Sequence, residues 1–373
     1  MKKGTACVAM LCILFLLSCR DQPASDRDPL DEFKNLKEYT LKGNPVLLAG
    51  DSVLYDPRDF RIFDTVAICY DDVGTAGFSA IGLKSGKLLR RFAFPGNGPS
   101  EFNLNALSLS QPMDDTAAFV ISQWNAPNRL YKYRLDSLLK SSTYKPDYFY
   151  QFPHGLEYRM AILENDSVLV GKLGGRSIDK NFFGIFHLKS NKLITGVSIP
   201  VIADDRHSKY YDSAYLDWTH WTLGGTVEFR PGGSHEIAYF STKGAFFQIF
   251  KTREGNGFDL IKQQLFYLPT FTLVSQGNRQ FAKPDRECRN GYNNIAVTKD
   301  RIYALYNGRP AASKGDGDLS ANTVLVYDWD GNAVERLHLP VDCYKISIDA
   351  SRPHDLYALR SFDSIGITRY SLP

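Results

Sequence analysis

The sequence predicts an all-β protein, a six-bladed β-propeller, from the composition of its short segments, their repetition and an unpaired segment near the N-terminus. After residue 40 the chain consists of short runs rich in Val, Ile, Tyr and Phe, bounded by Gly, Asp, Asn and Pro. Such runs are typical of strands joined by hairpins. We expect one short helix, over Leu135–Lys140.

The segments group into units of four strands. The clearest unit reads NNIAVTKDRIYALYNG and then NTVLVYDWDGNAVERLHLP, with a tight turn at Lys299-Asp300 and a hairpin at Asp330-Gly331, where glycine tolerates the positive φ of a two-residue loop. Units of about 40–50 residues that repeat in this way indicate a propeller. Six units, spaced 46 to 68 residues apart, begin near Arg58, Leu104, Tyr158, Thr226, Asn293 and Cys343.

The ring is predicted to close through the N-terminal segment. The last unit lacks a fourth strand, while the segment around Tyr39 to Leu48 has strand character and no unit of its own. Because an open edge strand invites aggregation, we expect this segment to complete the last blade. The two longest spacings indicate insertions before Thr226 and before Asn293. A β-sandwich or two small β-domains is the alternative fold.

The first residues resemble a lipoprotein signal. Two lysines precede a mostly apolar run from Thr5 to Leu17, too short to span a membrane, and Leu16-Leu17-Ser18-Cys19 resembles a lipobox. This implies a signal peptide at 1–18, a lipidated Cys19 with a flexible tether over 19–38, and a propeller over 39–373. We expect a lipid anchor at the bacterial outer membrane, on its periplasmic or surface face. An ordinary signal peptide with a chance cysteine is the alternative.

Charge and cysteine usage exclude some classes of protein. Without residues 1–18 the chain has 42 basic and 41 acidic side chains and no basic cluster, so no nucleic-acid partner is expected. Beyond the N-terminal segment only Cys69, Cys288 and Cys343 remain, none in a CxxC or Cys/His cluster, and we expect buried thiols.

Three stretches together resemble a known family. Cys19, GNGPSEF over residues 96–102 and RNGYNNIAVTKDRIYALYNG over residues 289–308 are similar to the TolB-like six-bladed propeller lipoproteins of Bacteroidetes. The resemblance implies the fold and a location in the cell envelope. It implies no reaction and no ligand.

The stretch FPGNGPSEF, residues 94–102, looks like a phosphate-binding loop but lacks its chemistry. Pro99 removes a backbone N–H donor, Glu101 would repel an anion, and no helix follows. We therefore expect a joint between two blades, with Glu101 accepting backbone N–H bonds, and no nucleotide. No cofactor or metal is expected either, since Tyr239 replaces the second histidine of an HExxH-like start at His235.

An aromatic insertion, residues 204–225, is the first candidate binding site. Its Trp and Tyr side chains combine large apolar faces with a polar group, which suits ligand and protein contacts. The candidate contact residues are Tyr210, Tyr211, Trp218, His220 and Trp221. Two alternatives are that these aromatics pack the insertion onto the rim, and that Asp204, Asp205, His207 and His220 bind a metal.

The second candidate site consists of Arg289, Asn290 and Tyr292, just before the innermost strand of the fifth unit. Residues at that position tend to line one mouth of a propeller channel. Pairing of Arg289 with an acid of a neighbouring blade is the alternative.

The function predicted from these features is a membrane-anchored envelope propeller, a binding or scaffold module for a protein, peptide or glycan. No complete catalytic constellation is visible in the sequence. The alternative is a hydrolase or lyase acting on envelope or dietary polysaccharide, with its residues scattered over blade loops.

Overall fold

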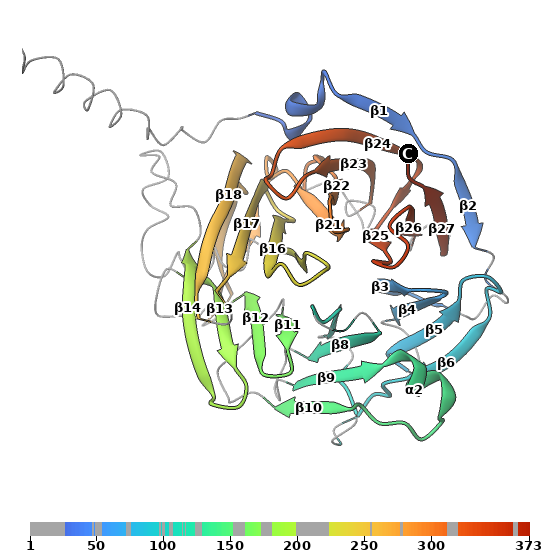
Figure 1. The fold of residues 1–373 in the computed structure, drawn as a ribbon. Coiled ribbons are helices and arrows are strands. Elements are labelled where there is room, and N and C mark those ends of the chain that lie inside the picture. The colour runs from blue at the N-terminus through green and yellow to red at the C-terminus, as the bar shows by residue number, and fades with distance from the viewer. Residues whose placement is uncertain are drawn as a thin grey trace, which may run out of the picture.

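The computed structural model has six blades around a central channel, five of them four-stranded sheets and one five-stranded, which confirms the predicted all-β six-bladed propeller (Figure 1). The structure describes residues 27–46, 48, 54–71, 76–96, 98, 101–103, 107–113, 115, 117–123, 129–151, 161–172, 181–198, 224–253, 256–276, 279–311, 320–360 and 365–373. The predicted signal peptide, Cys19 and the aromatic cluster from Tyr210 to Trp221 lie outside these residues.

Each blade is an antiparallel sheet whose first strand lies at the channel and whose fourth lies at the rim. Blades one to three contain β3 (Pro57–Phe63), β4 (Val66–Asp71), β5 (Phe78–Gly82) and β6 (Leu88–Phe92); β7 (Leu107–Ser110), β8 (Ala118–Gln123), β9 (Arg129–Arg134) and β10 (Tyr148–Gln151); and β11 (Ala161–Asn165), β12 (Val168–Lys172), β13 (Asn181–His187) and β14 (Lys192–Ser198). The predicted helix, α2 (Leu135–Lys140), joins β9 to β10.

The remaining blades follow the same pattern. Blades four to six contain β15 (Gly225–Phe229), β16 (Glu236–Ser241), β17 (Ala245–Thr252) and β18 (Phe258–Tyr267); β21 (Tyr292–Val297), β22 (Ile302–Tyr306), β23 (Ala321–Tyr327) and β24 (Ala333–Cys343); and β25 (Lys345–Ile348), β26 (Asp355–Arg360) and β27 (Gly366–Ser371). Every predicted unit start lies within three residues of the first strand of its blade. The insertion before the fifth blade contains a hairpin, β19 (Phe271–Gln276) and β20 (Arg279–Pro284).

The N-terminal segment closes the ring, as predicted. Strand β2 (Gly43–Val46) pairs antiparallel with β27 and supplies the fourth strand of blade six. Strand β1 (Lys37–Thr40) adds a feature that the sequence did not predict, because it pairs in parallel with β24 as a fifth strand of blade five. Contacts between the first strands of all neighbouring blades, including β25 with β3, complete the circle.

The folded body begins earlier than the predicted boundary at residue 39. A 3-10 helix, η1 (Pro29–Phe33), starts with a capping box in which Asp28 is the N-cap. The ring of Phe33 is 1% exposed and meets Tyr327 edge-on at 5.2 Å between ring centroids. Residues 29–38 therefore belong to the folded body, because Pro29 and Phe33 are buried and Leu30 packs against the same core cluster.

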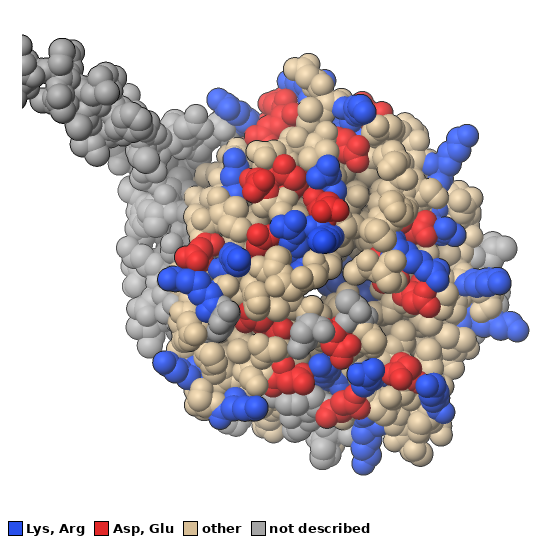
Figure 2. All heavy atoms as spheres, in the orientation of Figure 1, with Lys and Arg blue, Asp and Glu red and all other residues tan. Residues whose placement is uncertain are grey.

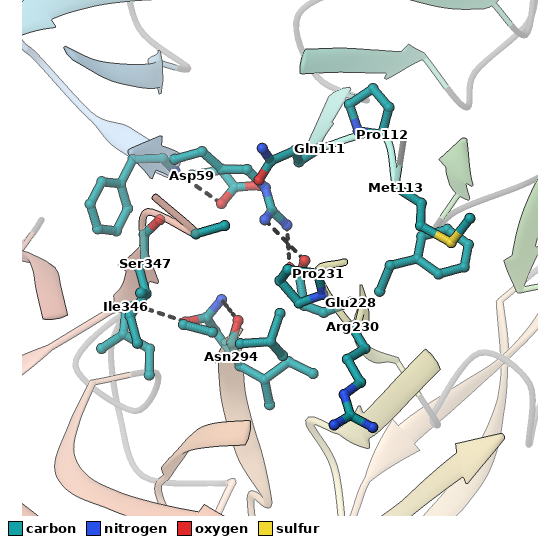
Figure 3. A pocket seen from close by; sticks show the side chains of 18 residues that line it. Asp59, Gln111, Pro112, Met113, Glu228, Arg230, Pro231, Asn294, Ile346 and Ser347 are labelled. Carbon is teal, nitrogen blue, oxygen red and sulfur yellow. Dashed lines mark hydrogen bonds and ion pairs between the residues drawn. The ribbon is translucent and has the colours of Figure 1, made fainter. Parts of the chain in front are cut away.

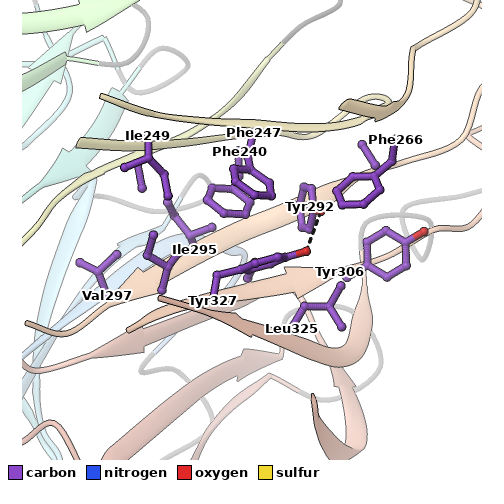
Figure 4. Close-up of a cluster of buried hydrophobic side chains, with 14 of the residues drawn as sticks. Phe240, Phe247, Ile249, Phe266, Tyr292, Ile295, Val297, Tyr306, Leu325 and Tyr327 are labelled. Carbon is purple, nitrogen blue, oxygen red and sulfur yellow. Dashed lines mark hydrogen bonds between the residues drawn. The ribbon is translucent and has the colours of Figure 1, made fainter. Parts of the chain in front are cut away.

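The core lies between blades. Among the described residues the buried apolar side chains form six clusters, and each cluster joins two neighbouring blades. Figure 4 shows the cluster between blades four and five, where Phe240 stacks on Phe247 at 4.7 Å and meets Tyr292 edge-on at 4.9 Å. Burying one such ring contributes about 1.5–3 kcal/mol. The described cysteines Cys69, Cys288 and Cys343 are buried free thiols, as expected.

Candidate functional site

The central channel is polar because the first strand of each blade alternates polar and apolar residues. In a strand successive side chains point to opposite faces, so one set faces the channel while the other packs between the blades. The sequence RDFRIF of β3 places Asp59 and Arg61 at the channel, with Phe60 and Ile62 buried. The equivalent channel residues include Ser108, Thr226, Glu228, Asn294, Lys345 and Ser347.

An ion pair crosses the channel between opposite blades (Figure 3). Arg61 of blade one donates two hydrogen bonds to the carboxylate of Glu228 of blade four, one of them 3.0 Å from Nη1 to Oε2. Its Nε donates to the carbonyl oxygen of Leu109 at 3.1 Å. The side chains of Arg61 and Glu228 are 19% and 7% exposed, so the pair forms a largely buried bar across the channel.

Burial and pairing act against each other in this ion pair. Burial raises the pKa of Glu228, and the adjacent Arg61 guanidinium opposes that rise. For Arg61 burial disfavours the charged form, but the charge and hydrogen bonds of Glu228 outweigh it and raise the pKa. A guanidinium stays protonated in proteins, and a bidentate pair is the strongest geometry for a carboxylate partner.

Two small cavities lie on either side of this bar. The first, about 40 Å³, lies where the first strands end and is lined by Gln111, Met113 and Arg230 among others. The second, about 120 Å³, lies toward the starts of those strands and is lined by Asp59, Ser108 and other residues, including the aliphatic Ile162 and Val227. Since a buried water needs about 10–15 Å³, these spaces are large enough for a few waters or one small molecule and too small for a polymer segment.

The second cavity contains an incomplete ion pair. Lys345 Nζ and Asp59 Oδ1 are 4.0 Å apart, which is too far for a hydrogen bond. Asn294 is satisfied, because its Oδ1 accepts from the Ile346 amide at 2.7 Å and its amide donates to the Ile295 carbonyl oxygen. The hydroxyl oxygen of Ser108 is buried and has no hydrogen-bond partner among the described residues.

A second polar cluster joins blades three and four at the face where the first strands end. Glu164, at the end of β11, is fully buried and its Oε1 bonds to His235 Nδ1 at 2.6 Å and accepts from Thr252 Oγ1 at 2.5 Å. Its Oε2 is buried without a partner among the described residues. His235 adopts a positive φ of 59° in the loop before β16. A carboxylate on Nδ1 fixes the orientation of an imidazole and leaves Nε2 for another group.

The predicted site residues Arg289, Asn290 and Tyr292 lie at the junction of blades four and five. Arg289 pairs with Asp28 at 2.5 Å and its guanidinium lies 4.4 Å above the ring of Tyr267. Asn290 is fully buried and accepts from Lys243 Nζ at 2.5 Å. The pKa of Tyr292 is raised well above its ordinary value, mainly by burial. Its hydroxyl oxygen lies 3.2 Å from that of Tyr327 (Figure 4). Ligand contact by these residues stays a prediction.

The stretch FPGNGPSEF joins blades one and two, as expected. Glu101 accepts a hydrogen bond from the Gly98 amide at 2.8 Å, and Gly96 has a φ of 157°. The amide of Phe102 donates to the Phe94 carbonyl oxygen at 3.0 Å, which brings the two ends of the stretch together. Phe102 is buried against Tyr131, with ring centroids 4.4 Å apart. The described part of the loop therefore binds itself through Glu101 and binds blade two through Arg129, which donates to the carbonyl oxygens of Gly98 and Glu101.

Several channel residues escaped the sequence analysis. Asp59, Arg61, Glu228 and Lys345 lie in strands, where charged residues are ordinarily assigned to solvent. The available signal was a charge at alternate positions within a first strand, as in RDFRIF and TVEFR. The first strand of each blade lies at the channel, so a charge that alternates with apolar residues there points into the channel.

The surface carries no large patch of one charge on the face that Figure 2 displays. Lysines and arginines are interspersed with aspartates and glutamates around a central hollow. This agrees with a nearly neutral chain. In the part of the chain that the structure describes, no group of three or more His, Cys, Asp or Glu side chains is placed to hold a metal ion. No helix within the described ranges is long and apolar enough to cross a membrane.

Comparison with known proteins supports the fold. Residues 258–351 match the model of the family described as TolB-like 6-blade propeller-like. This match covers blade five and parts of its neighbours, and the six blades agree with the family's description. No curated protein matches the chain.

Three solved structures are similar in shape. The β-propeller domain of Cps50 (Swd1) from Myceliophteria thermophila has 12% identity and a TM-score of 0.46, over 89% of this chain and 100% of that one. BamB from Moraxella catarrhalis has 10% identity and a TM-score of 0.38, over 84% and 71%. A protein of unknown function from Bacteroides thetaiotaomicron has 11% identity and a TM-score of 0.48, over 90% and 74%.

Proposed function

We propose that this protein is a membrane-anchored propeller of the bacterial cell envelope that binds a protein, peptide or glycan partner on one of its loop faces. The observation that carries the proposal is the Arg61–Glu228 bar, which divides the channel into cavities of about 40 and 120 Å³. A partner larger than a small molecule must therefore bind the outer surface.

One face gathers the long connections and is the face we propose for the partner. Neighbouring strands of a blade are antiparallel, so the fourth strand ends at the face where the next blade's first strand begins. Two long connections therefore start and end on this face. One runs from β14 to β15 and contains the aromatic insertion; the other runs from β18 to β21 and contains β19 and β20. Loops on a rigid scaffold commonly carry binding residues.

We propose that the lipid anchor is tethered at the same face, because the N-terminal end of the described chain lies there. Asp28 contacts Arg289, which precedes β21, and Tyr306, which ends β22, and both positions are at that face. Only eight residues separate Asp28 from Cys19. At about 5–6 Å × √n for a flexible chain, eight residues span roughly 14–17 Å on average, so this face is expected to lie near the bilayer. A partner bound there would itself lie close to the membrane.

The decisive experiment captures partners with the full acylated protein. Chemical crosslinking in cells that express the protein, followed by pull-down and a glycan array, identifies the partner. Replacing Trp218 and Trp221 by Ala is expected to abolish its capture. The matched control replaces Leu89 and Phe94, which are 48% and 53% exposed on blade one, and is expected to retain it. Equal capture by both variants would overturn the proposal for this face.

The lipid anchor has its own test. Metabolic labelling with a palmitate analogue is expected to mark the wild-type protein and to leave Cys19→Ala unlabelled and released from the membrane fraction. Labelling of the Cys19→Ala variant would refute the anchor.

One observation favours the alternative, a polysaccharide hydrolase or lyase. The buried carboxylate of Glu164 holds His235 by Nδ1, and this is the arrangement in which a histidine serves as a general base or acid. The imidazole is 31% exposed, so a substrate at that face can reach it. Turnover of any envelope or dietary polysaccharide that disappears in His235→Gln and persists in Trp218→Ala would establish this function instead.

A further inference from the structure

The cavity on the strand-start side of the Arg61–Glu228 bar has hydrogen-bonding groups that no described residue uses. Lys345 carries three N–H donors, and no side chain or carbonyl within the described residues accepts a hydrogen bond from it; its nearest charge is Asp59 Oδ1 at 4.0 Å. Asp59 Oδ1 accepts only from the backbone amide of Phe60, at 2.9 Å. Unused polar groups around a cavity require water or a ligand, since leaving them unpaired is costly.

These groups come from three consecutive blades. Lys345 starts β25 of blade six, Asp59 lies on β3 of blade one and Ser108 lies on β7 of blade two. The Ser108 hydroxyl is buried without a partner in the part of the chain that is described. All three line the cavity of about 120 Å³. They therefore form one site, built where the first strands of neighbouring blades converge.

The charges of the site select the class of ligand. The Arg61 guanidinium is already neutralised by Glu228, so Asp59 and Lys345 are the two charges left for a ligand. A simple anion would be attracted by Lys345 and repelled by Asp59. A simple cation would be attracted by Asp59 and repelled by Lys345. A molecule with both charges a short distance apart satisfies both at once, because its ammonium and carboxylate groups match the opposite charges of the wall.

The size and the walls narrow the class further. A cavity of about 150 Å³ holds a benzene ring, so 120 Å³ suits a molecule with slightly fewer atoms. Ile162 and Val227 supply aliphatic wall beside the polar groups. We propose that this cavity binds a free α-amino acid with a small aliphatic side chain, with its ammonium group at Asp59, its carboxylate at Lys345 and a further hydrogen bond to Ser108. This cavity lies on the same side of the propeller as the partner face proposed above, but none of its lining residues is a proposed partner contact.

The test measures binding of alanine to the full-length protein in detergent by calorimetry, with saturation-transfer NMR as a second readout. Alanine is expected to bind, and Lys345→Met and Asp59→Asn are each expected to weaken binding by about tenfold or more, as the loss of one buried charge contact does. The matched control is Lys87→Met, which replaces an exposed lysine of blade one and is expected to leave binding unchanged. Thermal unfolding of each variant reports whether it is folded.

Two further probes separate the alternatives. Acetate carries the carboxylate alone and methylammonium the ammonium alone, and both are expected to bind more weakly than alanine. Equal binding of acetate would show an anion site, and equal binding of methylammonium a cation site; either would overturn the proposal. No binding of alanine at millimolar concentration would also overturn it and leave a site filled by water. Partner capture by Lys345→Met is expected to be normal, so failure here is distinct from failure of the proposed function.

Discussion

Replacing Gly291 by Ala is expected to destabilise the propeller severely, because the backbones of blades four and five touch at this residue. A Cβ there would overlap the carbonyl oxygen of Gly244 and lie 2.6 Å from that of Ser241, and both are backbone atoms that no side-chain rotation can move. The Gly291 amide also donates to the Thr242 carbonyl oxygen at 2.7 Å, and Gly244 donates to Arg289 at 2.9 Å. Gly291 is thus the point where the two blades are joined.

The magnitude follows from what the added methyl group must break. Separating the two backbones disrupts both hydrogen bonds, each worth about 0.5–1.5 kcal/mol, and leaves buried polar groups unpaired at about 1–3 kcal/mol each. We expect a loss of about 3–5 kcal/mol in the free energy of unfolding. This is a large share of the stability of a typical domain, about 5–15 kcal/mol.

Urea denaturation followed by circular dichroism measures this loss. The matched control is Gly224→Ala, since a Cβ at Gly224 would meet no atom within 4 Å and its backbone does not have a positive φ. The control is expected to change stability by less than about 0.5 kcal/mol. A Gly291→Ala variant as stable as Gly224→Ala would refute the close approach of the two blades.

Three further predictions concern the joints of the fold. Replacing Glu101 by Ala removes its hydrogen bond to the Gly98 amide and is expected to lower the free energy of unfolding by about 1 kcal/mol. ATP is expected to leave the thermal unfolding temperature of the wild-type protein unchanged, and a shift with ATP would contradict the role of this stretch as a joint. Replacing Asp28 by Ala removes a helix cap and a partly exposed ion pair with Arg289, and is expected to lower the free energy of unfolding by about 2 kcal/mol. Limited proteolysis near residue 30 is expected to become faster. An unchanged digestion pattern would argue against docking of this segment. Burial raises the pKa of Tyr267 to about 12, so the stabilisation from its neutral hydroxyl is complete below pH 10 and is lost as the pH rises from 10 to 12. In that window the free energy of unfolding decreases with pH, and Tyr267→Phe is expected to make this decrease shallower by at most about 1.4 kcal/mol per pH unit. An unchanged slope would count against this assignment.

The structure explains the first residues of RNGYNNIAVTKDRIYALYNG, another of the stretches on which the family resemblance rests. In RNGYNN, Arg289 binds the N-terminal Asp28, Asn290 pairs with Lys243, and Gly291 allows the close approach of two backbones. Tyr292 then enters the core between the blades. These four residues therefore contribute to the joint between blades four and five.

The fold could be predicted from the sequence because its signals are local. Alternation of apolar residues and turn residues such as Asp330-Gly331 mark each hairpin, where Gly331 has the expected positive φ of 77°. The helix at Leu135–Lys140 and the starts of the six blades follow from the same local patterns. The missing fourth strand of the last unit was enough to predict that β2 closes the ring.

The channel could not be predicted in the same way, because its residues meet only after the ring closes. Arg61 and Glu228 are separated by 167 positions in the sequence and come from opposite blades, and Asp59 meets Lys345 across the junction of the first and last blades. Nothing near either residue in the sequence indicates its partner. The docking of Phe33 was also missed, since a single aromatic residue in a polar segment acquires its contacts from distant strands.

The sequence by itself determined the repeating unit, the number of blades and the closing strand, because strand alternation and turn chemistry act between neighbouring residues. The tertiary structure alone decided which charges share the channel, that an ion pair divides it into two cavities, and that Lys345 and Asp59 face a space with unused hydrogen-bonding capacity. The physical reason is that ring closure sets the distances between charges on different blades, and those distances decide which of them pair.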